Sequence, residues 1–146
     1  MKPISIENDH IRLTLQNAKE AGLYGRRRKR NNDRRLIFAI SSKSDNAKTA
    51  IGTIALTETD FERREAAIGR PVITLIEAGP EIPEGDAVRL LCRLAFEVLR
   101  LEEIVHYVDK KDEASLRLFQ TCGFTPTSSI VKQGGQSFYE MRLCSG

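Results

Sequence analysis

The sequence predicts one α/β domain of the α+β type, a mixed β-sheet with helices on its faces. Three observations predict it. The length of 146 residues fits a single domain, residues 1–146, with one core. A composition of 40% hydrophobic and 29% charged residues is typical of a soluble globular protein. Strand and helix patterns alternate only in the second half of the chain, which favours a mixed sheet.

The first half of the chain predicts strands and one helix. Residues 11–15 alternate apolar and polar side chains, which is typical of a strand. Asn17 can cap a helix over residues 18–30, although Gly22 and Gly25 each cost ~1 kcal/mol relative to Ala inside a helix. Further strands are expected at residues 36–41 and 50–57, and a charged loop at residues 59–65.

The second half opens with a strand inside residues 66–77, most favourably residues 72–76. Residues 78–85, AGPEIPEG, interrupt the chain because two prolines and two glycines suit neither a strand nor a helix. Asp86 then begins a strong helix. The polar residues of this helix form one narrow stripe, so most of its circumference should be buried. They are Asp86, Arg89, Arg93, Glu97 and Arg100, with Arg93 and Glu97 placed to form an i,i+4 pair.

The last elements are a strand over residues 104–108, a helix and a hairpin. Asp109 or Asp112 can cap the helix, and Gly123 ends it. Gly134-Gly135 predicts a hairpin between strands at residues 130–132 and 137–143. One face of the helix presents Ser115, Leu118, Phe119 and Cys122.

Cysteine and histidine usage predicts neither a disulfide framework nor a metal site. The three cysteines form no CxxC pair, and His10 and His106 are far apart. We therefore expect a reducing, cytoplasmic setting. No apolar run approaches the ~20 residues of a membrane span, and residues 1–13 lack the continuous apolar segment of a secretory signal, so we expect no membrane association.

The net charge of +3 is unevenly distributed. Residues 26–35, RRRKRNNDRR, hold seven basic side chains and one acidic one, which leaves the rest of the chain at −3. One interpretation is a solvated helix end and loop. The other is a surface that attracts an acidic or phosphate-bearing partner, including a nucleic acid.

Residues 50–124 resemble a known family. Residues 51–56 read IGTIAL, residues 86–101 read DAVRLLCRLAFEVLRL, and residues 112–124 read DEASLRLFQTCGF. These segments resemble a strand and two helices of the GNAT superfamily of N-acetyltransferases. With the loop TETDFERREAAIG at residues 57–69, they are similar to its ribosomal-protein-alanine acetyltransferase subgroup.

The resemblance implies a mostly antiparallel sheet with a central parallel pair that splays apart around acetyl-CoA. By analogy, residues 72–76 and 104–108 form that pair. The implied activity is transfer of acetyl from acetyl-CoA to a primary amine, a protein N-terminus or a small amine, by direct attack. Many relatives form homodimers. The implied coenzyme-binding residues are Leu75, Ile76, Gly85, Asp86, Ala87, Asp112, Ser115 and Phe119.

Two further roles follow from the resemblance. Glu77, at the end of the predicted central strand, is the implied general base. The N-terminal basic cluster lies in the region that forms one wall of the family's acceptor site. Arg26, Arg27 and Arg30 are therefore the implied acceptor-binding residues.

The sequence departs from the family at the phosphate-binding turn. The family pattern, (Gln/Arg)-x-x-Gly-x-(Gly/Ala), falls on residues 79–84, GPEIPE, where the glycine positions hold Ile82 and Glu84. Pro80 and Pro83 lack the amide N–H that a phosphate cradle uses. Carboxylates also stand where an anion would bind, and like charges repel.

Two positions near the last helix depart as well. Asp112 stands where the family has an Asn that contacts pantetheine, and Phe119 stands where it often has a Tyr that acts as general acid. Asp cannot donate like an amide, and Phe has no polar group. The alternative interpretation is therefore a GNAT-like protein that has lost acetyl-CoA binding. It would act as a protein- or nucleic-acid-interaction module through residues 26–35.

Overall fold

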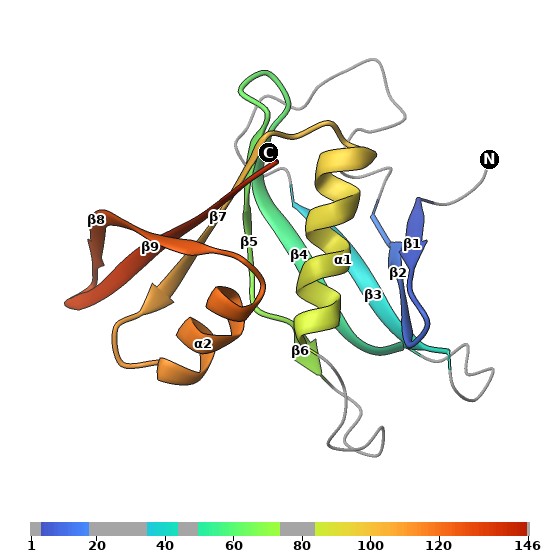
Figure 1. Ribbon diagram of the computed structural model, residues 1–146, viewed down its shortest axis with the longest axis horizontal. Coiled ribbons are helices and arrows are strands. Elements are labelled where there is room, and N and C mark those ends of the chain that lie inside the picture. The colour runs from blue at the N-terminus through green and yellow to red at the C-terminus, as the bar shows by residue number, and fades with distance from the viewer. Residues whose placement is uncertain (1–3, 18–34, 44–49, 74–83, 146) are drawn as a thin grey trace.

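The computed structural model describes residues 4–17, 35–43, 50–73 and 84–145 (Figure 1). These residues form nine strands and two helices. The strands are β1 (Ser5–Glu7), β2 (Ile11–Leu15), β3 (Leu36–Ser42), β4 (Ala50–Asp60), β5 (Glu65–Ile68), β6 (Val72–Ile73), β7 (Glu103–Asp109), β8 (Thr125–Gln133) and β9 (Gln136–Cys144). The helices are α1 (Glu84–Glu97) and α2 (Glu113–Thr121).

All nine strands belong to one sheet. Its order is β1-β2-β3-β4-β5-β7-β9-β8, and β6 pairs with β4 outside this path. Every pairing is antiparallel except that of β5 with β7, which is parallel. The predicted class, a mixed and mostly antiparallel sheet with a central parallel pair, is confirmed. The predicted helix over residues 18–30 lies outside the described residues.

The parallel partner of β7 differs from the prediction, which gave residues 72–76 this place. The structure gives it to β5, because β4 continues to Asp60 and the chain reverses earlier than expected. Oδ1 of Asp60 accepts hydrogen bonds from the backbone N–H groups of Glu62 and Arg63, at 2.9 and 3.0 Å, and closes the turn. The charged loop predicted at residues 59–65 is therefore wrong, since its ends belong to β4 and β5.

Helix α1 packs its apolar surface against the sheet beside β1, β2 and β4 (Figure 1). Its buried residues are Ala87, Val88, Leu90, Leu91, Cys92, Leu94 and Ala95. The predicted polar stripe is confirmed in part, since Arg89, Arg93 and Glu97 are exposed. The helix begins two residues before the predicted start at Asp86 and ends before Arg100, which has a positive φ of 61°. Nε of Arg93 lies 3.2 Å from Oε2 of Glu97, which confirms the i,i+4 pair.

Helix α2 packs on β7 and also contacts α1. The thiol of Cys122 lies 3.7 Å from the carbonyl oxygen of Gly85, which joins the end of α2 to the start of α1. Buried side chains of both helices and of the sheet form one hydrophobic cluster. Among the described residues, neither helix is long and apolar enough to cross a membrane.

Gly52, in the IGTIAL segment, has a specific packing role. A Cβ atom at this position would lie 2.3 Å from the backbone oxygen of Val72, closer than real Cβ contacts allow. Gly52 and Ile73 are partners in the pairing of β4 with β6. Only a residue without a side chain lets the β6 segment lie this close to β4.

Candidate functional site

The parallel strands β5 and β7 separate after a short paired stretch. Their last paired residues are Ala67 and Val105. Beyond this point the chain continues into β6, which pairs with β4, whereas β7 continues beside β9 as far as Asp109. We call the diverging segments, residues 68–73 and 106–109, the strand split. Each side of the split is thus held by a different neighbouring strand.

His106 bridges the narrow end of the strand split. Its Nδ1 lies 2.8 Å from the carbonyl oxygen of Ile68. A carbonyl only accepts hydrogen bonds, so Nδ1 carries the proton and donates it. The imidazole is buried and stacks on the ring of Phe119, with centroids 3.6 Å apart. Burial lowers the pKa of His106, so the neutral ring has its lone pair on Nε2 at neutral pH.

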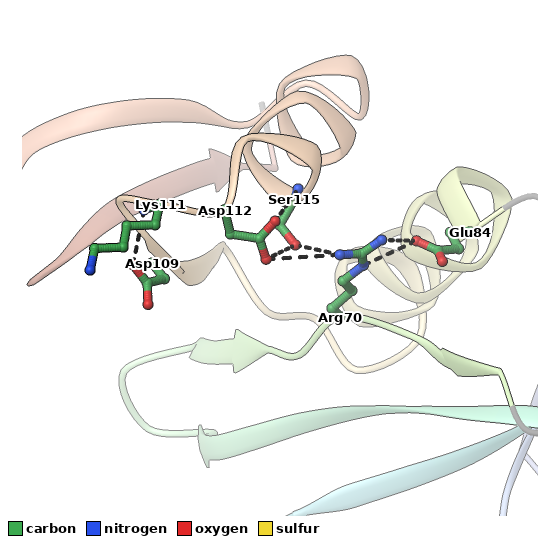
Figure 2. A network of polar contacts seen from close by, with 6 residues as sticks. All are labelled: Arg70, Glu84, Asp109, Lys111, Asp112 and Ser115. Atoms are coloured by element: carbon green, nitrogen blue, oxygen red, sulfur yellow. Dashed lines mark hydrogen bonds and ion pairs between the residues drawn. The ribbon is translucent and has the colours of Figure 1, made fainter. Parts of the chain in front are cut away.

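Arg70 lies on the other side of the split, between β5 and β6, and connects both helices (Figure 2). Glu84 is the first residue of α1, and its Oε2 accepts hydrogen bonds from Nε and Nη2 of Arg70, each at 3.1 Å. The Nη1 atom of Arg70 donates to Oγ of Ser115 on α2, at 2.9 Å, and lies 3.8 Å from Oδ2 of Asp112. One guanidinium therefore links the strand split to the beginnings of α1 and α2.

Asp112 caps α2, as one of the two predicted candidates. Its Oδ1 accepts from the backbone N–H of Ser115 at 3.0 Å, and its Oδ2 accepts from the Ser115 hydroxyl at 2.7 Å. These bonds, together with the charge of Arg70, hold the pKa of Asp112 below its usual range. Asp109, the other candidate, instead accepts from the backbone N–H of Lys111 at 2.9 Å (Figure 2).

The structure brings together four of the residues that the sequence assigned to coenzyme binding. Gly85 and Asp86 lie in the first turn of α1, and Asp112 and Ser115 lie at the start of α2. Two others face the core, since the exposed fraction is 1% for Ala87 and 0% for Phe119, and Ser115 is itself only 3% exposed. The remaining predicted site residues, Leu75, Ile76, Glu77, Arg26, Arg27 and Arg30, lie outside the described residues.

Sequence reasoning missed Arg70. Its partners Glu84 and Ser115 are 14 and 45 positions away in the chain, so no local pattern connects them. The available signal was the tripeptide Gly69-Arg70-Pro71 between two apolar runs, where proline prevents a regular strand. His106 lies in the strand predicted at residues 104–108, but its partner Ile68 is 38 positions away, so no local pattern predicts this contact.

The charges and hydrogen bonds at the split restrict what can bind there. The Ser115 hydroxyl donates to Asp112 and accepts from Arg70, so its proton is already used. Glu84 and Asp86 put carboxylates in the first turn of α1, where they interact favourably with the helix dipole. An anionic group that binds at the beginning of α1 must therefore compete with these carboxylates. In the described part of the chain, no three His, Cys, Asp or Glu side chains are grouped to hold a metal ion.

A mixed sheet with a diverging central parallel pair, flanked by the beginnings of two helices, is the architecture of a GNAT-type acetyltransferase. Residues 8–125 match the family model described as Acetyltransferase (GNAT) domain, and the chain belongs to this family.

Solved structures with this fold include spermidine N-acetyltransferase SpeG from Vibrio cholerae. The complex of that enzyme with CoA and spermine has a TM-score of 0.64 and 20% identity, covering 75% of this chain and 65% of that one. Its dodecameric structure in an intermediate state gives a TM-score of 0.64 and 20% identity, covering 75% and 64%. At such identities the likeness shows the fold alone. The chain thus spans slightly under two thirds of that enzyme's length. No curated protein matches the sequence significantly.

Proposed function

We propose that this chain transfers acetyl from acetyl-CoA to a primary amine by direct attack in a ternary complex. Membership of the GNAT family supports the reaction class. The observation that carries the proposal is the separation of β5 and β7 beyond Ala67 and Val105, because it leaves two strand segments facing one another without mutual backbone pairing. An extended pantetheine arm can use such backbone groups.

The proposed donor site consists of the residues around the strand split. Gly85, Asp86, Asp112 and Ser115 surround the donor, and Leu75 and Ile76, which lie outside the described residues, stay proposed as further contacts. Ala87 and Phe119 support this site from the core, since both are buried. Proton removal from the attacking amine needs a base, for which we retain Glu77.

The acceptor is proposed as a small amine or a protein N-terminus. The bacterial enzyme SpeG has been solved in complex with CoA and spermine, which supports a polyamine as one candidate. The similarity of residues 57–101 to the ribosomal-protein-alanine subgroup supports a peptide N-terminus as the other. Arg26, Arg27 and Arg30 remain the proposed acceptor wall, where they favour an acidic or phosphate-bearing acceptor.

A turnover assay tests the function. The full chain is incubated with acetyl-CoA and either spermidine or a peptide with an N-terminal alanine. Release of free CoA thiol is followed together with the gain of one acetyl group in the amine by mass spectrometry. We expect both signals with at least one acceptor class. CoA release no faster than in the absence of protein, with every amine, would reject the proposal.

The second candidate is an interaction module that has lost acetyl-CoA binding. It is favoured by the pairing of Arg70 with Glu84 and by the double use of the Ser115 hydroxyl. Its binding surface would be residues 26–35, toward a protein or a nucleic acid. Isothermal titration discriminates the two, because this candidate predicts no heat with millimolar acetyl-CoA. Binding to a nucleic acid through this surface would weaken steeply with added salt.

We also propose a cytoplasmic setting and a homodimer. The scattered cysteines support the first, since Cys92 is buried, Cys122 is half-buried and only Cys144 is exposed, all as free thiols. Light scattering on the purified chain tests the second, and a monomer at micromolar concentration would contradict it.

A further inference from the structure

Arg70 is a half-exposed cation at the edge of the strand split. Its side chain is 41% exposed, and its contacts with Glu84, Ser115 and Asp112 all lie at the beginnings of the two helices. Its planar fork of N–H donors suits bidentate binding of carboxylates and phosphates. Figure 2 shows the Arg70 guanidinium between Glu84 at the beginning of α1 and Ser115 at the beginning of α2, where it can bind an anionic group.

The two carboxylates near Arg70 differ in how firmly they are held. Both oxygens of Asp112 accept hydrogen bonds from Ser115, so this group is fixed as the cap of α2. In the described part of the chain, Glu84 pairs with Arg70 alone, and its side chain is 31% exposed. Solvent screens an ion pair with this exposure, so it is weak. Glu84 is thus the partner that Arg70 can exchange.

We propose that Arg70 binds the phosphate groups of the acyl donor by exchanging Glu84 for a donor phosphate. This inference rests on the proposed function, in which the donor is acetyl-CoA. The sequence gives it a reason, because Pro80 and Pro83 remove two N–H donors from the turn before α1. A side-chain cation can recognise a phosphate in place of these two missing donors.

Partner exchange predicts that the two variants change the affinity for the donor in opposite directions. Other roles of Arg70 predict changes in the same direction. Under exchange, Arg70→Ala removes the phosphate ligand and weakens donor binding, whereas Glu84→Gln removes a competitor and tightens it. If Arg70 only blocked the site, both variants would tighten binding, since both break the same pair. If the pair only supported the fold, both would weaken binding and lower the melting temperature.

The experiment is isothermal titration of the full chain and both variants with acetyl-CoA and with acetyl-pantetheine, which carries no phosphate. Arg93→Ala is the matched control, because it also breaks an arginine–glutamate pair on α1. Position 93 is nine residues beyond Glu84, roughly 13 Å along the helix. Thermal unfolding of each variant shows whether the fold is retained.

For acetyl-CoA we expect Arg70→Ala to raise the dissociation constant at least about tenfold, the effect of one charge-assisted hydrogen bond. Glu84→Gln should lower it about threefold or more, as loss of a nearby like charge does. Neither variant should change the affinity for acetyl-pantetheine, and Arg93→Ala should match the wild type with both ligands.

Two different failures are distinguishable. If the wild type binds neither ligand, the proposed function fails and the inference fails with it. If the wild type binds acetyl-CoA but both variants shift its affinity in the same direction, or equally for acetyl-pantetheine, the function stands and partner exchange is wrong.

Discussion

The Nδ1 atom of His106 donates to the carbonyl oxygen of Ile68 across 2.8 Å, just beyond the last backbone pairing of β5 with β7. Where the backbone pairing of β5 with β7 ends, a side-chain hydrogen bond thus connects the two segments. The ring of His106 is in turn fixed by stacking on Phe119. This relationship sets the narrow end of the strand split, and it has a measurable consequence for pH dependence.

Stability should fall as the pH falls through the ordinary range of histidine. Burial lowers the pKa of His106 from its usual 6.5, so the unfolded chain binds this proton more readily than the folded one. The stabilising contribution is complete above the unfolded pKa and is lost as the pH decreases toward the folded pKa. Urea unfolding of wild type and His106→Asn, between about pH 7 and pH 5, measures this. The wild type should lose more stability than the variant, whose amide can also donate to Ile68. Equal losses would contradict this role of His106.

Phe119→Tyr should not restore a general acid. Phe119 is fully buried, with its ring against His106 and edge-on to Phe124, at a centroid distance of 5.2 Å. An added hydroxyl would be desolvated there, at a cost of about 1–3 kcal/mol if it found no partner. We expect a lower unfolding free energy and no increase in kcat. Phe119→Leu is the control for ring loss. A stable Phe119→Tyr variant with a clearly higher kcat would show that this position reaches the reacting groups.

Asp112→Asn should strengthen acetyl-CoA binding while keeping α2 capped. The asparagine oxygen can still accept from the backbone N–H of Ser115, and the variant removes one carboxylate beside the split. It also frees the Ser115 hydroxyl from its present acceptor. Asp109→Asn is the control, since Asp109 accepts instead from the backbone of Lys111. Titration calorimetry measures both, and unchanged or weaker binding by Asp112→Asn alone would count against the proposed donor site.

Gly52→Ala should destabilise the protein, because the new methyl group would meet the backbone oxygen of Val72 at 2.3 Å. Relief requires a shift of β6 away from β4, and overpacking of this kind costs about 1–3 kcal/mol. Gly69→Ala is a matched control in the same region, since a Cβ atom there meets nothing within 4 Å. Chemical denaturation should separate the two variants. If they unfold at the same midpoint, the close approach at Gly52 is not important for stability.

The sequence predicted most elements because their signals are local. The periodicity of α1, the Asp112 cap and the Gly134-Gly135 turn all depend on nearby residues. Both glycines have positive φ, 54° and 81°, which is what the predicted tight hairpin requires.

The sequence prediction of the strands is wrong at residues 59–65, where the local charge pattern indicates a loop but the chain pairs as strands at both ends of this segment. Thr59 lies in a charged segment that resembles a loop, yet its side chain is buried in β4. Because of that error, residues 72–76 were predicted as the parallel partner of β7, a place that β5 takes in the structure. The contacts of Arg70 and His106 join elements that are distant in sequence, so only the folded chain brings them together.

An NMR titration of the ¹⁵N-labelled chain with acetyl-CoA tests most directly whether the strand split is the donor site. We expect saturable shifts of amide signals on both sides of the split and at the helix beginnings, including Ile68, Arg70, His106 and Ser115. The β8–β9 hairpin tip at Gly134 and Gly135 should not respond. Saturable shifts confined to that hairpin, or no shifts at millimolar acetyl-CoA, would contradict a donor site at the split.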